Sequence, residues 1–244
     1  CRKGRGIALN KVERAVILAA GYGNRMKPVT LGTPKPLVKV NGIRMIDTAI
    51  EALHYNGIYE IYVVVGYLKE QFYEWKKEYP EITLIENPFF DSCNNISSLY
   101  VAKEYLENAV IMDGDQIISN KEVLKPMFEH SGYNSVWVDT FTDEWLQTVR
   151  NGIVTSCSRN GGERGWRLYS ISRWTSEDGR RLKQHLEREF EEKKNCEIYW
   201  DDIALFCYPQ EYRLGIYPMK MGDVTEIDSI DELVEIDPGY RKYV

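Results

Sequence analysis

The stretch RAVILAAGYGNRMKPVTLGTPKPL, residues 14–37, decides the fold. It begins with a continuous apolar run (15–20), which is typical of a central strand of a parallel sheet that is buried on both faces. Three glycines, an arginine, two lysines and three prolines follow this run. In open α/β sheets, ligands bind at the carboxyl ends of the strands. The stretch therefore predicts a buried strand followed by a loop that holds an anion.

Apolar runs and amphipathic segments alternate along the first half of the chain. Amphipathic segments between apolar, β-branched runs predict βαβ units, in which a helix crosses over between two parallel strands. We therefore expect an α/β fold with a doubly wound, mostly parallel (Rossmann-like) sheet. The predicted strands are 15–20, 61–66, 82–87 and 109–115, and the predicted helices are 44–57, 68–79 and 97–108.

The second half has shorter, partly alternating segments separated by Gly or Asn, which predict antiparallel strands attached to the parallel sheet. Thr175 precedes a charged helical segment as a capping residue, and Ser229 with Glu232 has the pattern of a capping box before the last helix. The second half therefore predicts an antiparallel extension of the sheet. Its predicted strands are 134–140, 144–150, 152–158 and 166–172, and its long helix is 175–194.

Composition and charge exclude several classes of function. Of the 244 residues, 43% are hydrophobic and 28% are charged, as in ordinary soluble globular proteins. The net charge of -6 argues against a nucleic-acid partner, because binding to a phosphate backbone usually requires a basic surface. No apolar run reaches membrane-spanning length, and no signal peptide opens the sequence. We therefore expect no membrane partner.

The five cysteines are scattered and odd in number, without a CxxC pair or a Cys/His cluster. This pattern indicates neither a zinc site nor a disulfide framework, so we expect a reducing, cytoplasmic compartment. The sequence starts at Cys1 rather than Met. We interpret residues 1–13 as a linker remnant, from a trimmed chain or from a piece of a longer protein.

The glycine loop has the chemistry of a phosphate site. Gly21 and Gly23 let the backbone approach a ligand closely with its N–H groups pointing outward. Arg25 and Lys35 add two cations, and the prolines stiffen the loop. The dinucleotide fingerprint is excluded because its third glycine position falls on Met26, and no GK[ST] follows for a Walker A loop. For the glycines alone, a plain turn with solvated basic residues is an equal alternative.

The whole string LAAGYGNRMKPVTLGTPKPL resembles the signature of the nucleotidyltransferases that activate sugar phosphates and related phosphates. The resemblance implies that the loop holds the triphosphate of an NTP while the bond at the α-phosphate exchanges. It also implies that Arg25 and Lys35 are catalytic, because they neutralise charge on the phosphates. The candidate nucleotide-binding residues in this loop are Leu18, Ala19, Ala20, Gly21 and Gly23.

Two polyanions must meet in such a reaction, which calls for a divalent metal. In IMDGDQ, Asp113 and Asp115 end a predicted strand and alternate with Gly114, so they are expected to face one way; a polar turn is the alternative. The resemblance matches Asp115, and Asp228 in TEIDSID, to metal-binding aspartates. Two carboxylates with phosphate oxygens suit Mg²⁺, which is the expected cofactor.

An attacking phosphate is already ionised at neutral pH, so alignment and charge neutralisation suffice and no catalytic nucleophile or base is needed. None of the three histidines lies beside a predicted nucleophile. We expect His54, His130 and His185 to be structural or surface residues.

The segments GYLKEQF (66–72) and ENPFFDSCNNISSLYVAKEYL (86–106) are similar to the bacterial phosphocholine cytidylyltransferases, including forms fused to a choline kinase. The similarity implies CTP as the donor and a fused choline kinase domain as a possible partner. Asn94 and Asn95 match the segment near the base, and amides suit the polar edge of cytosine. Alternatively, Asn95 caps the helix that follows it.

A choline head group has no N–H to donate, so cation–π attraction to aromatic faces holds it. The resemblance places Trp145, Tyr199 and Asp201 at the acceptor site, whereas Trp174 is more readily explained as core. The chain departs from its relatives at Val138, where a basic residue is expected to bind the acceptor phosphate. Arg150, Arg167 and Arg173 are the possible substitutes.

We therefore expect a metal-dependent cytidylyltransferase that converts CTP and phosphocholine to CDP-choline and pyrophosphate by in-line attack at the α-phosphorus. The alternatives are a 2-aminoethylphosphonate cytidylyltransferase, a sugar-1-phosphate nucleotidyltransferase, or a non-catalytic nucleotide-binding regulatory module. Residues 14–244 are expected to form one domain, with a nucleotide-binding half (14–118) and an acceptor-binding half (119–244).

Overall fold

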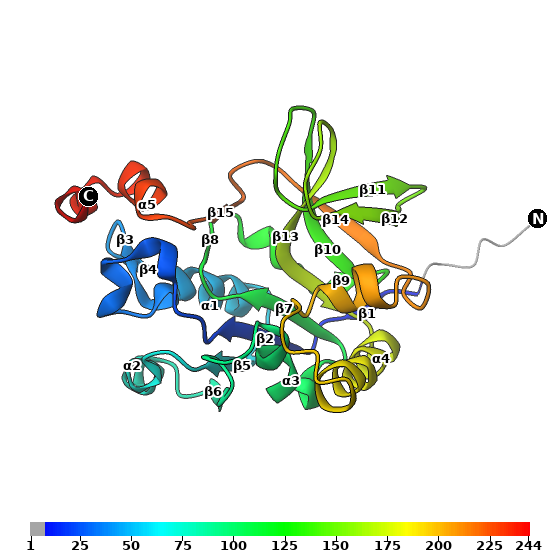
Figure 1. Ribbon diagram of the computed structural model, residues 1–244, viewed down its shortest axis with the longest axis horizontal. Helices are drawn as coiled ribbons and strands as arrows, with labels where there is room; N and C mark the ends of the chain where they lie inside the picture. The colour runs from blue at the N-terminus through cyan, green and yellow to red at the C-terminus, as the bar shows by residue number, and fades with distance from the viewer. Residues whose placement is uncertain (1–7) are drawn as a thin grey trace, which may run out of the picture.

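The computed structural model describes residues 8–244. Four parallel strands form one end of a nine-stranded mixed sheet, in the order β7, β2, β5 and β6, with β6 at the edge (Figure 1). Each predicted strand of the first half is present within one or two residues, except that β7 ends before Asp115. The doubly wound prediction is confirmed. The bounds are Arg14–Ala19 for β2, Glu60–Val65 for β5, Thr83–Glu86 for β6 and Ala109–Asp113 for β7.

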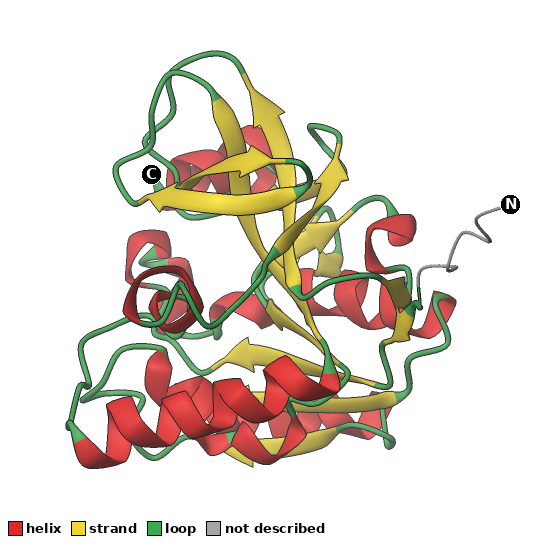
Figure 2. Cartoon of the chain, turned by 90° about the vertical axis from the view of Figure 1, so that its right-hand side faces the viewer, coloured by secondary structure: helices red, strands yellow, loops and turns green. Residues whose placement is uncertain are grey.

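Both faces of the parallel strands are buried, which explains why their sequences are continuously apolar. Along β2, Ala15 and Ile17 belong to one hydrophobic core, and Val16 and Leu18 belong to the other. Helices therefore cover both sides of this part of the sheet (Figure 2). On the first side lie α1 (Met45–Tyr55) and α2 (Lys69–Trp75); on the second lie α3 (Ile96–Val101) and α4 (Ser176–Leu186).

The second half adds the predicted antiparallel strands through one long strand, β13 (Gly165–Trp174). The last residues of β13 pair with β7, and nearly its whole length pairs with β10. Strands β10, β14, β12, β11 and β13 then pair in a closed circuit, because β13 also pairs with β11. The bounds are Gly132–Val138 for β10, Leu146–Arg150 for β11, Ile153–Ser158 for β12 and Gly215–Met219 for β14.

The capping signals correctly located two helix starts. The Thr175 side chain accepts a hydrogen bond of 3.1 Å from the Asp178 N–H at the start of α4, and Ser229 and Glu232 form the capping box of α5 (Ile230–Ile236). The predicted helix 175–194 continues past α4 as a π-helical segment, Glu187–Glu192. A second π-helical segment is Ile203–Cys207.

Short elements complete the fold around these layers. Two small antiparallel pairs, β8 with β15 and β3 with β4, lie beside the main sheet. Their bounds are Gln116–Ile118 (β8), Val224–Glu226 (β15), Lys39–Val40 (β3) and Ile43–Arg44 (β4), and the outer 3-10 turns are Lys76–Glu78, Lys103–Tyr105, Lys121–Leu124 and Pro238–Tyr243.

The folded part of the chain starts earlier than we expected. Residues 1–7 of the predicted linker lie outside the described residues, but β1 (Asn10–Lys11) pairs with β9 (Met127–Phe128) and Val12 is 2% exposed. Residues 10–13 thus belong to the fold rather than to a linker. In the described part of the chain, no helix combines the length and the apolar character that crossing a membrane requires.

Candidate active site

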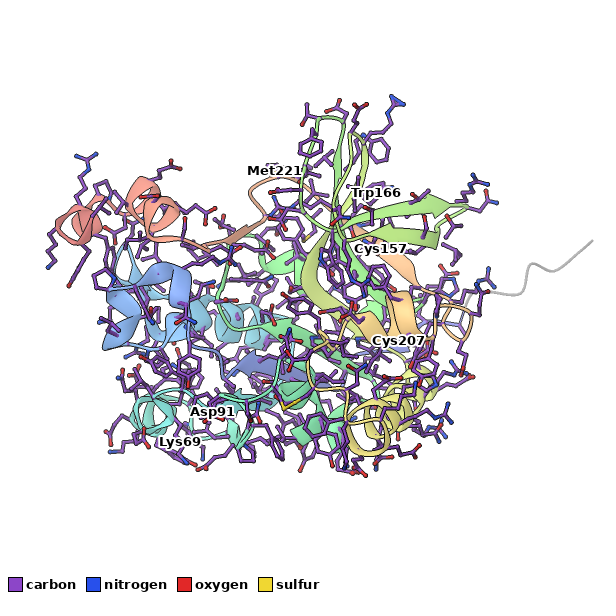
Figure 3. The ribbon with its side chains drawn as sticks, in the orientation of Figure 1. Lys69, Asp91, Cys157, Trp166, Cys207 and Met221 are labelled. Carbon is purple, nitrogen blue, oxygen red and sulfur yellow. A yellow bond between two sulfur atoms is a disulfide. The ribbon has the colours of Figure 1, made fainter. Side chains whose placement is uncertain are left out.

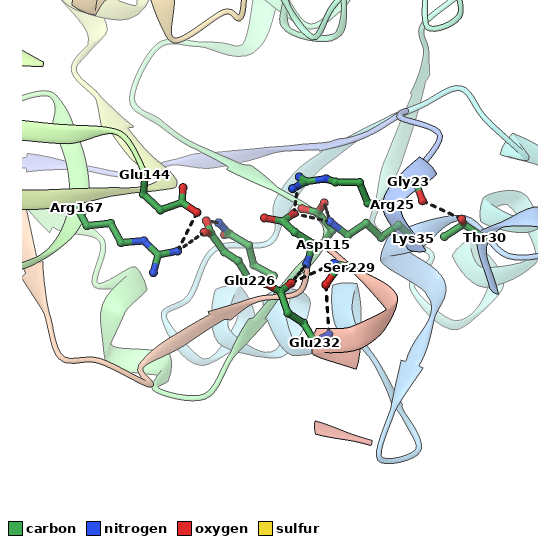
Figure 4. A network of polar contacts seen from close by, with 12 residues as sticks. Gly23, Arg25, Thr30, Lys35, Asp115, Glu144, Arg167, Glu226, Ser229 and Glu232 are labelled. Carbon is green, nitrogen blue, oxygen red and sulfur yellow. Dashed lines mark hydrogen bonds and ion pairs between the residues drawn. The ribbon is translucent and has the colours of Figure 1, made fainter. Parts of the chain in front are cut away.

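The glycine loop folds back on itself directly after β2. Three 3-10 turns follow (Asn24–Met26, Val29–Leu31 and Lys35–Leu37), and Gly23 adopts a left-handed conformation with φ 63°. The Thr30 hydroxyl donates a hydrogen bond of 2.8 Å to the Gly23 carbonyl (Figure 4). A Cβ added at Gly23 would lie 3.0 Å from side-chain atoms of both Thr30 and Lys35. Gly23 is therefore required by the fold of the loop itself.

Gly21 has the opposite surroundings. A Cβ added there would meet no atom of the described chain within 4 Å. The residue is exposed and lines a cavity at the carboxyl end of β2. Its missing side chain leaves the backbone open on the side from which a ligand approaches.

Strand pairing brings the two predicted metal carboxylates together from opposite ends of the sequence. In the β8–β15 ladder, Gln116 pairs with Glu226. This register places Asp115, just before β8, near Asp228, just after β15. The capping box of α5 then holds the Asp228 backbone, because the Glu232 side chain accepts a hydrogen bond of 2.6 Å from the Asp228 N–H.

A buried lysine lies between these carboxylates. The Lys35 Nζ is 2.7 Å from an Asp115 carboxylate oxygen and 3.0 Å from one of Asp228, and the Arg25 guanidinium is 3.2 Å from Asp228 (Figure 4). Burial lowers the pKa of Lys35, but the charges of Asp115 and Asp228 outweigh it, so the net pKa is raised. One positively charged atom thus reaches both carboxylates, and hard oxygen donors so placed suit Mg²⁺.

Two adjoining cavities meet at this cluster. The glycine-loop cavity, of about 360 Å³, follows the loop, and the aromatic cavity, of about 250 Å³, lies toward the second half of the chain. Their shared lining residues are the predicted charged residues and one further aspartate: Arg25, Asp113, Asp115 and Asp228. The charged cluster therefore lies where a ligand in one cavity would meet a ligand in the other.

Two aromatic rings line the far part of the aromatic cavity. Trp145 and Tyr199 pack edge to face, with ring centroids 5.8 Å apart, and Tyr199 is 48% exposed. Asp201 lies beside them and accepts a hydrogen bond of 2.7 Å from the buried Tyr133 hydroxyl. Burial raises the pKa of Asp201 to about 7. The adjacent Asp202 is engaged elsewhere, because it accepts from the Arg159 Nε at 3.1 Å.

The same cavity has a second acidic wall. Burial raises the pKa of Glu226 to about 7, and burial with the nearby charges of Asp115 and Asp201 raises the pKa of Asp113 well above its usual value. Arg167 donates to Glu226 at 3.1 Å and lies 3.7 Å from a Glu144 oxygen (Figure 4). Within residues 8–244, the Nε of Arg167 is buried and has no hydrogen-bond partner.

The structure separates the three arginines that the sequence offered as substitutes at Val138. Arg167 contacts the cavity wall, as described above. Arg173 is buried in the core and donates to the Lys125 and Val123 carbonyls and to the Asn134 side chain. Arg150 is exposed at the end of β11. Arg167 does not itself line the aromatic cavity, but of the three arginines it is the one that pairs with residues of its lining, Glu226 and Glu144.

Most of the candidate residues line the cavities, but a few do not. Leu18 and Ala19 line the glycine-loop cavity, whereas the lining of neither cavity includes Ala20, whose carbonyl accepts a hydrogen bond from the Tyr67 N–H. Asn94 donates its side-chain amide to the Glu197 carbonyl and also lines neither cavity. The structure thus engages Ala20 and Asn94 in contacts within the protein.

Asn95 does line the aromatic cavity, but it does not cap α3 as the alternative expectation had it. It occupies the N-cap position without a side-chain capping hydrogen bond, and its side-chain oxygen accepts from the Trp200 N–H at 2.9 Å. Trp174 is fully buried in a hydrophobic core, as expected. The three histidines line neither cavity.

Sequence reasoning gave no site role to several residues of the aromatic cavity. The strand pattern placed Asp113 on the same side as Asp115, and Glu226 alternates with Asp228 in TEID, so both could have been found from their spacing. Glu144, just before β11, and Leu168 and Ser170, on β13, carry no comparable signal, because long-range strand pairing brings them to the cavity.

The expectation of no disulfide is wrong. Cys93 and Cys196 form a disulfide with their Cα atoms 5.0 Å apart, across 103 residues of sequence. Such a distant pairing cannot be deduced from cysteine spacing alone.

Comparisons with known proteins agree with this geometry. A family model described as a MobA-like NTP transferase domain matches residues 15–188. A protein from Lancefieldella rimae named 2-aminoethylphosphonate cytidylyltransferase is 36% identical over 228 residues, which cover 93% of this chain and 92% of that protein. A choline-phosphate cytidylyltransferase from Streptococcus pneumoniae is 30% identical over 224 residues, which cover 92% of this chain and 96% of that protein.

Among solved structures, the CTP:phosphocholine cytidylyltransferase from Streptococcus pneumoniae superposes with a TM-score of 0.83 at 30% identity. The match covers 92% of this chain and 97% of that chain. The similarity therefore extends over both cavities rather than over the glycine loop alone.

Proposed function

The chain belongs to the MobA-like NTP transferase family and is a nucleotidyltransferase; on that premise we propose that it transfers the cytidylyl group of CTP to phosphocholine. The products are CDP-choline and pyrophosphate. The observation that carries the proposal is the shared wall of the two cavities, where Arg25, Asp115 and Asp228 lie between a phosphate loop and an aromatic pocket.

The glycine-loop cavity receives the triphosphate. The open backbone at Gly21 approaches the phosphates closely, and Arg25 and Lys35 neutralise their charge. Asp115 and Asp228 would hold Mg²⁺, which when bound neutralises the phosphates further and is the expected cofactor. Lys35 is charged in this site because the two carboxylates raise its pKa, and the phosphates supply further negative charge beside it.

The aromatic cavity receives phosphocholine. The quaternary ammonium lies against the rings of Trp145 and Tyr199 by cation–π attraction, with the Asp201 carboxylate nearby. Its phosphate points toward the shared wall, and Arg167, which pairs with Glu226 and Glu144 of the aromatic cavity, is the arginine that would reach it in place of the residue expected at position 138. Both substrates are thus aligned across Asp113, Asp115 and Asp228.

In the reaction, an oxygen of the acceptor phosphate attacks the α-phosphorus of CTP. A new P–O bond forms as the bond to the β-phosphate oxygen breaks, and pyrophosphate leaves on the opposite side. The attacking phosphate is already ionised, so alignment and charge neutralisation account for the catalysis. No residue of the chain has to remove a proton.

The two halves of the chain would form the two sites that the sequence predicts, apart from two residues. Residues 14–118 supply most of the nucleotide site and residues 119–244 most of the acceptor site. However, Asp228 contributes to the first and Asn95 to the second. A cytoplasmic location, where CTP is available, and a fused choline kinase domain remain predictions from the sequence.

A second acceptor, 2-aminoethylphosphonate, is favoured by the acidic walls of the aromatic cavity. A primary ammonium can donate hydrogen bonds to Asp201 and Asp113, which a quaternary ammonium cannot do. The 36% identical relative carries that name. A sugar phosphate fits less well, because a sugar needs several neutral polar partners where this cavity presents two aromatic rings and a row of carboxylates.

The acceptors can be separated by varying only the number of methyl groups on nitrogen. Pyrophosphate release would be measured with CTP, Mg²⁺ and phosphoethanolamine carrying zero to three N-methyl groups, beside 2-aminoethylphosphonate and glucose 1-phosphate. We expect kcat/KM to rise with each methyl group and to be highest for phosphocholine. A clear preference for the phosphonate or for the sugar would overturn this choice, and no release with any acceptor would favour a non-catalytic nucleotide-binding module.

A further inference from the structure

The Cys93–Cys196 disulfide joins two segments that line the aromatic cavity, which is the proposed acceptor pocket. Its Cα atoms are 5.0 Å apart, and Figure 3 shows a disulfide as a yellow bond between sulfur atoms. Cys93 directly precedes Asn94 and Asn95, and Cys196 lies three residues before Tyr199. The bond therefore connects the segment that carries Asn95 to the segment that carries Tyr199 and Asp201.

The second of these segments has few other attachments to the first. Residues 193–199 form bends and irregular backbone between two π-helical segments. Across the joint, the Asn94 N–H donates to the Cys196 carbonyl at 2.8 Å, the Asn94 side chain donates to the Glu197 carbonyl at 3.0 Å, and the Trp200 N–H donates to Asn95 at 2.9 Å. Removal of the covalent bond would leave these three hydrogen bonds to join the two segments, while Tyr199 still packs on Trp145 and Asp201 still accepts a hydrogen bond from Tyr133.

We propose that the Cys93–Cys196 pair is a redox-controlled modification site that sets the affinity of the acceptor pocket. In the oxidised state the disulfide holds the segment that carries Tyr199 and Asp201 in its binding position. Little conformational freedom is then lost when the acceptor binds. In the reduced state the segment samples more conformations, and the acceptor binds more weakly. The proposal rests on the proposed function only in naming phosphocholine as the acceptor.

The exchange chemistry balances with thiols and disulfides alone. A dithiol reductant gives two electrons and two protons to the Cys93–Cys196 bond and becomes a cyclic disulfide. Glutathione disulfide reverses the change through a mixed disulfide and leaves as two glutathione thiols. Both cysteines are partly exposed, so both reagents reach them.

The other two described cysteines are poor competitors for this exchange. Cys157 and Cys207 are free, and burial raises the pKa of both thiols, that of Cys157 to about 12. The thiolate is the reactive form, so little of either is available at neutral pH. Cys207 is the more exposed of the two and supplies the control variant.

The test compares the oxidised and the reduced full chain. The protein would be equilibrated with glutathione disulfide or with dithiothreitol, and peptide mass spectrometry would verify the Cys93–Cys196 link. We expect the Kd for phosphocholine by calorimetry, and its KM, to rise about three- to thirtyfold on reduction while the KM for CTP changes less than twofold. Cys93→Ser and Cys196→Ser should have the weak affinity under both conditions, and Cys207→Ser should respond like the unmodified chain.

Hydrogen exchange supplies a readout that does not depend on turnover. Backbone amides in residues 195–202 should exchange faster after reduction, whereas those of β2 should not change. Equal phosphocholine affinity in the two states would overturn the redox proposal even where exchange differs. Absence of pyrophosphate release in both states, with a redox-dependent Kd, would instead count against the proposed reaction and support the redox site.

Discussion

Lys35 lies 2.7 Å from Asp115 and 3.0 Å from Asp228, so that one ammonium group contacts both carboxylates. Asp115→Asn and Asp228→Asn would each remove a charge from this point. We expect either change to lower kcat by about a hundred- to a thousandfold. This is the range found when an enzyme loses one preorganised group that stabilises the charge of the transition state. Pyrophosphate release at saturating Mg²⁺ measures this effect. Asp139→Asn, at an exposed position outside the cavities, should retain full activity.

The two loop glycines should respond differently to alanine. Gly21→Ala places its methyl group in open space, so stability should not change, but the KM for CTP should rise at least about tenfold, because the methyl group occupies the side from which the phosphates approach. Gly23→Ala should instead lower the free energy of unfolding by about 1–2 kcal/mol, because its φ of 63° is left-handed. Urea denaturation and CTP kinetics separate the two effects. Gly32→Ala, with free space and an ordinary φ, should affect neither.

The aromatic wall should distinguish methylated from unmethylated acceptors. Trp145→Leu should raise the KM for phosphocholine by about 2- to 30-fold, the range of one cation–π contact, and should affect phosphoethanolamine less. Trp137→Leu is a matched control, because Trp137 is 50% exposed, packs edge to face on Trp166 and lines neither cavity. Equal effects of the two substitutions on phosphocholine would contradict the aromatic site.

Acceptor binding should depend on pH through Asp201. Burial raises the pKa of this carboxyl to about 7, so it is protonated below that value and ionised above it. An ammonium is attracted only by the ionised form, so kcat/KM for the acceptor should rise as pH increases through about 7. The free protein should become less stable over the same rise, from about pH 4 to 7, since the unfolded carboxyl releases its proton first. Asp201→Asn should reduce both effects and leave the part that is due to Glu226, whose pKa is also raised to about 7. pH–rate profiles and urea melts at several pH values would detect the difference.

Arg167 should affect the acceptor and not the donor. Arg167→Met should raise the acceptor KM by about ten- to a hundredfold, because a charge-assisted contact to the phosphate is lost, and should leave the KM for CTP within about twofold. Arg167→Lys should recover part of the loss. Arg150→Met, at an exposed strand end, is the control. If the KM for CTP rose as much as the KM for the acceptor, Arg167 would support the binding of both substrates and would not be specific for the acceptor phosphate.

The parallel half of the fold could be predicted because its signals are local. The apolar run of β2 and the glycines after it lie within one short stretch of sequence. The capping box at Ser229, which belongs to the second half, is also a local signal, because its two residues are only three positions apart. Strand β14 was missed because it is short and contains Pro218, which weakens any strand prediction.

The acceptor site could be predicted only in part, because its residues meet through long-range contacts. The Arg167–Glu226 pair joins residues 59 apart, and the disulfide joins residues 103 apart. Of the adjacent aspartates, the sequence could not tell that Asp201 lies in the cavity while Asp202 pairs with Arg159. The hydrophobic pattern of a sequence does not show which of two adjacent aspartates faces a cavity.

Strand β13 pairs with β7 at one end and with β10 and β11 along the rest of its length. Because one continuous strand belongs to both parts of the sheet, a movement of one half relative to the other would have to bend β13, whose pairing with β10 is irregular between Ser172 and Leu168. We therefore expect solvent to be excluded from the cavities by local rearrangements of the glycine loop and of residues 193–199. Exchange of those segments between relatives would be the direct way to change which acceptor is used while the scaffold stays rigid.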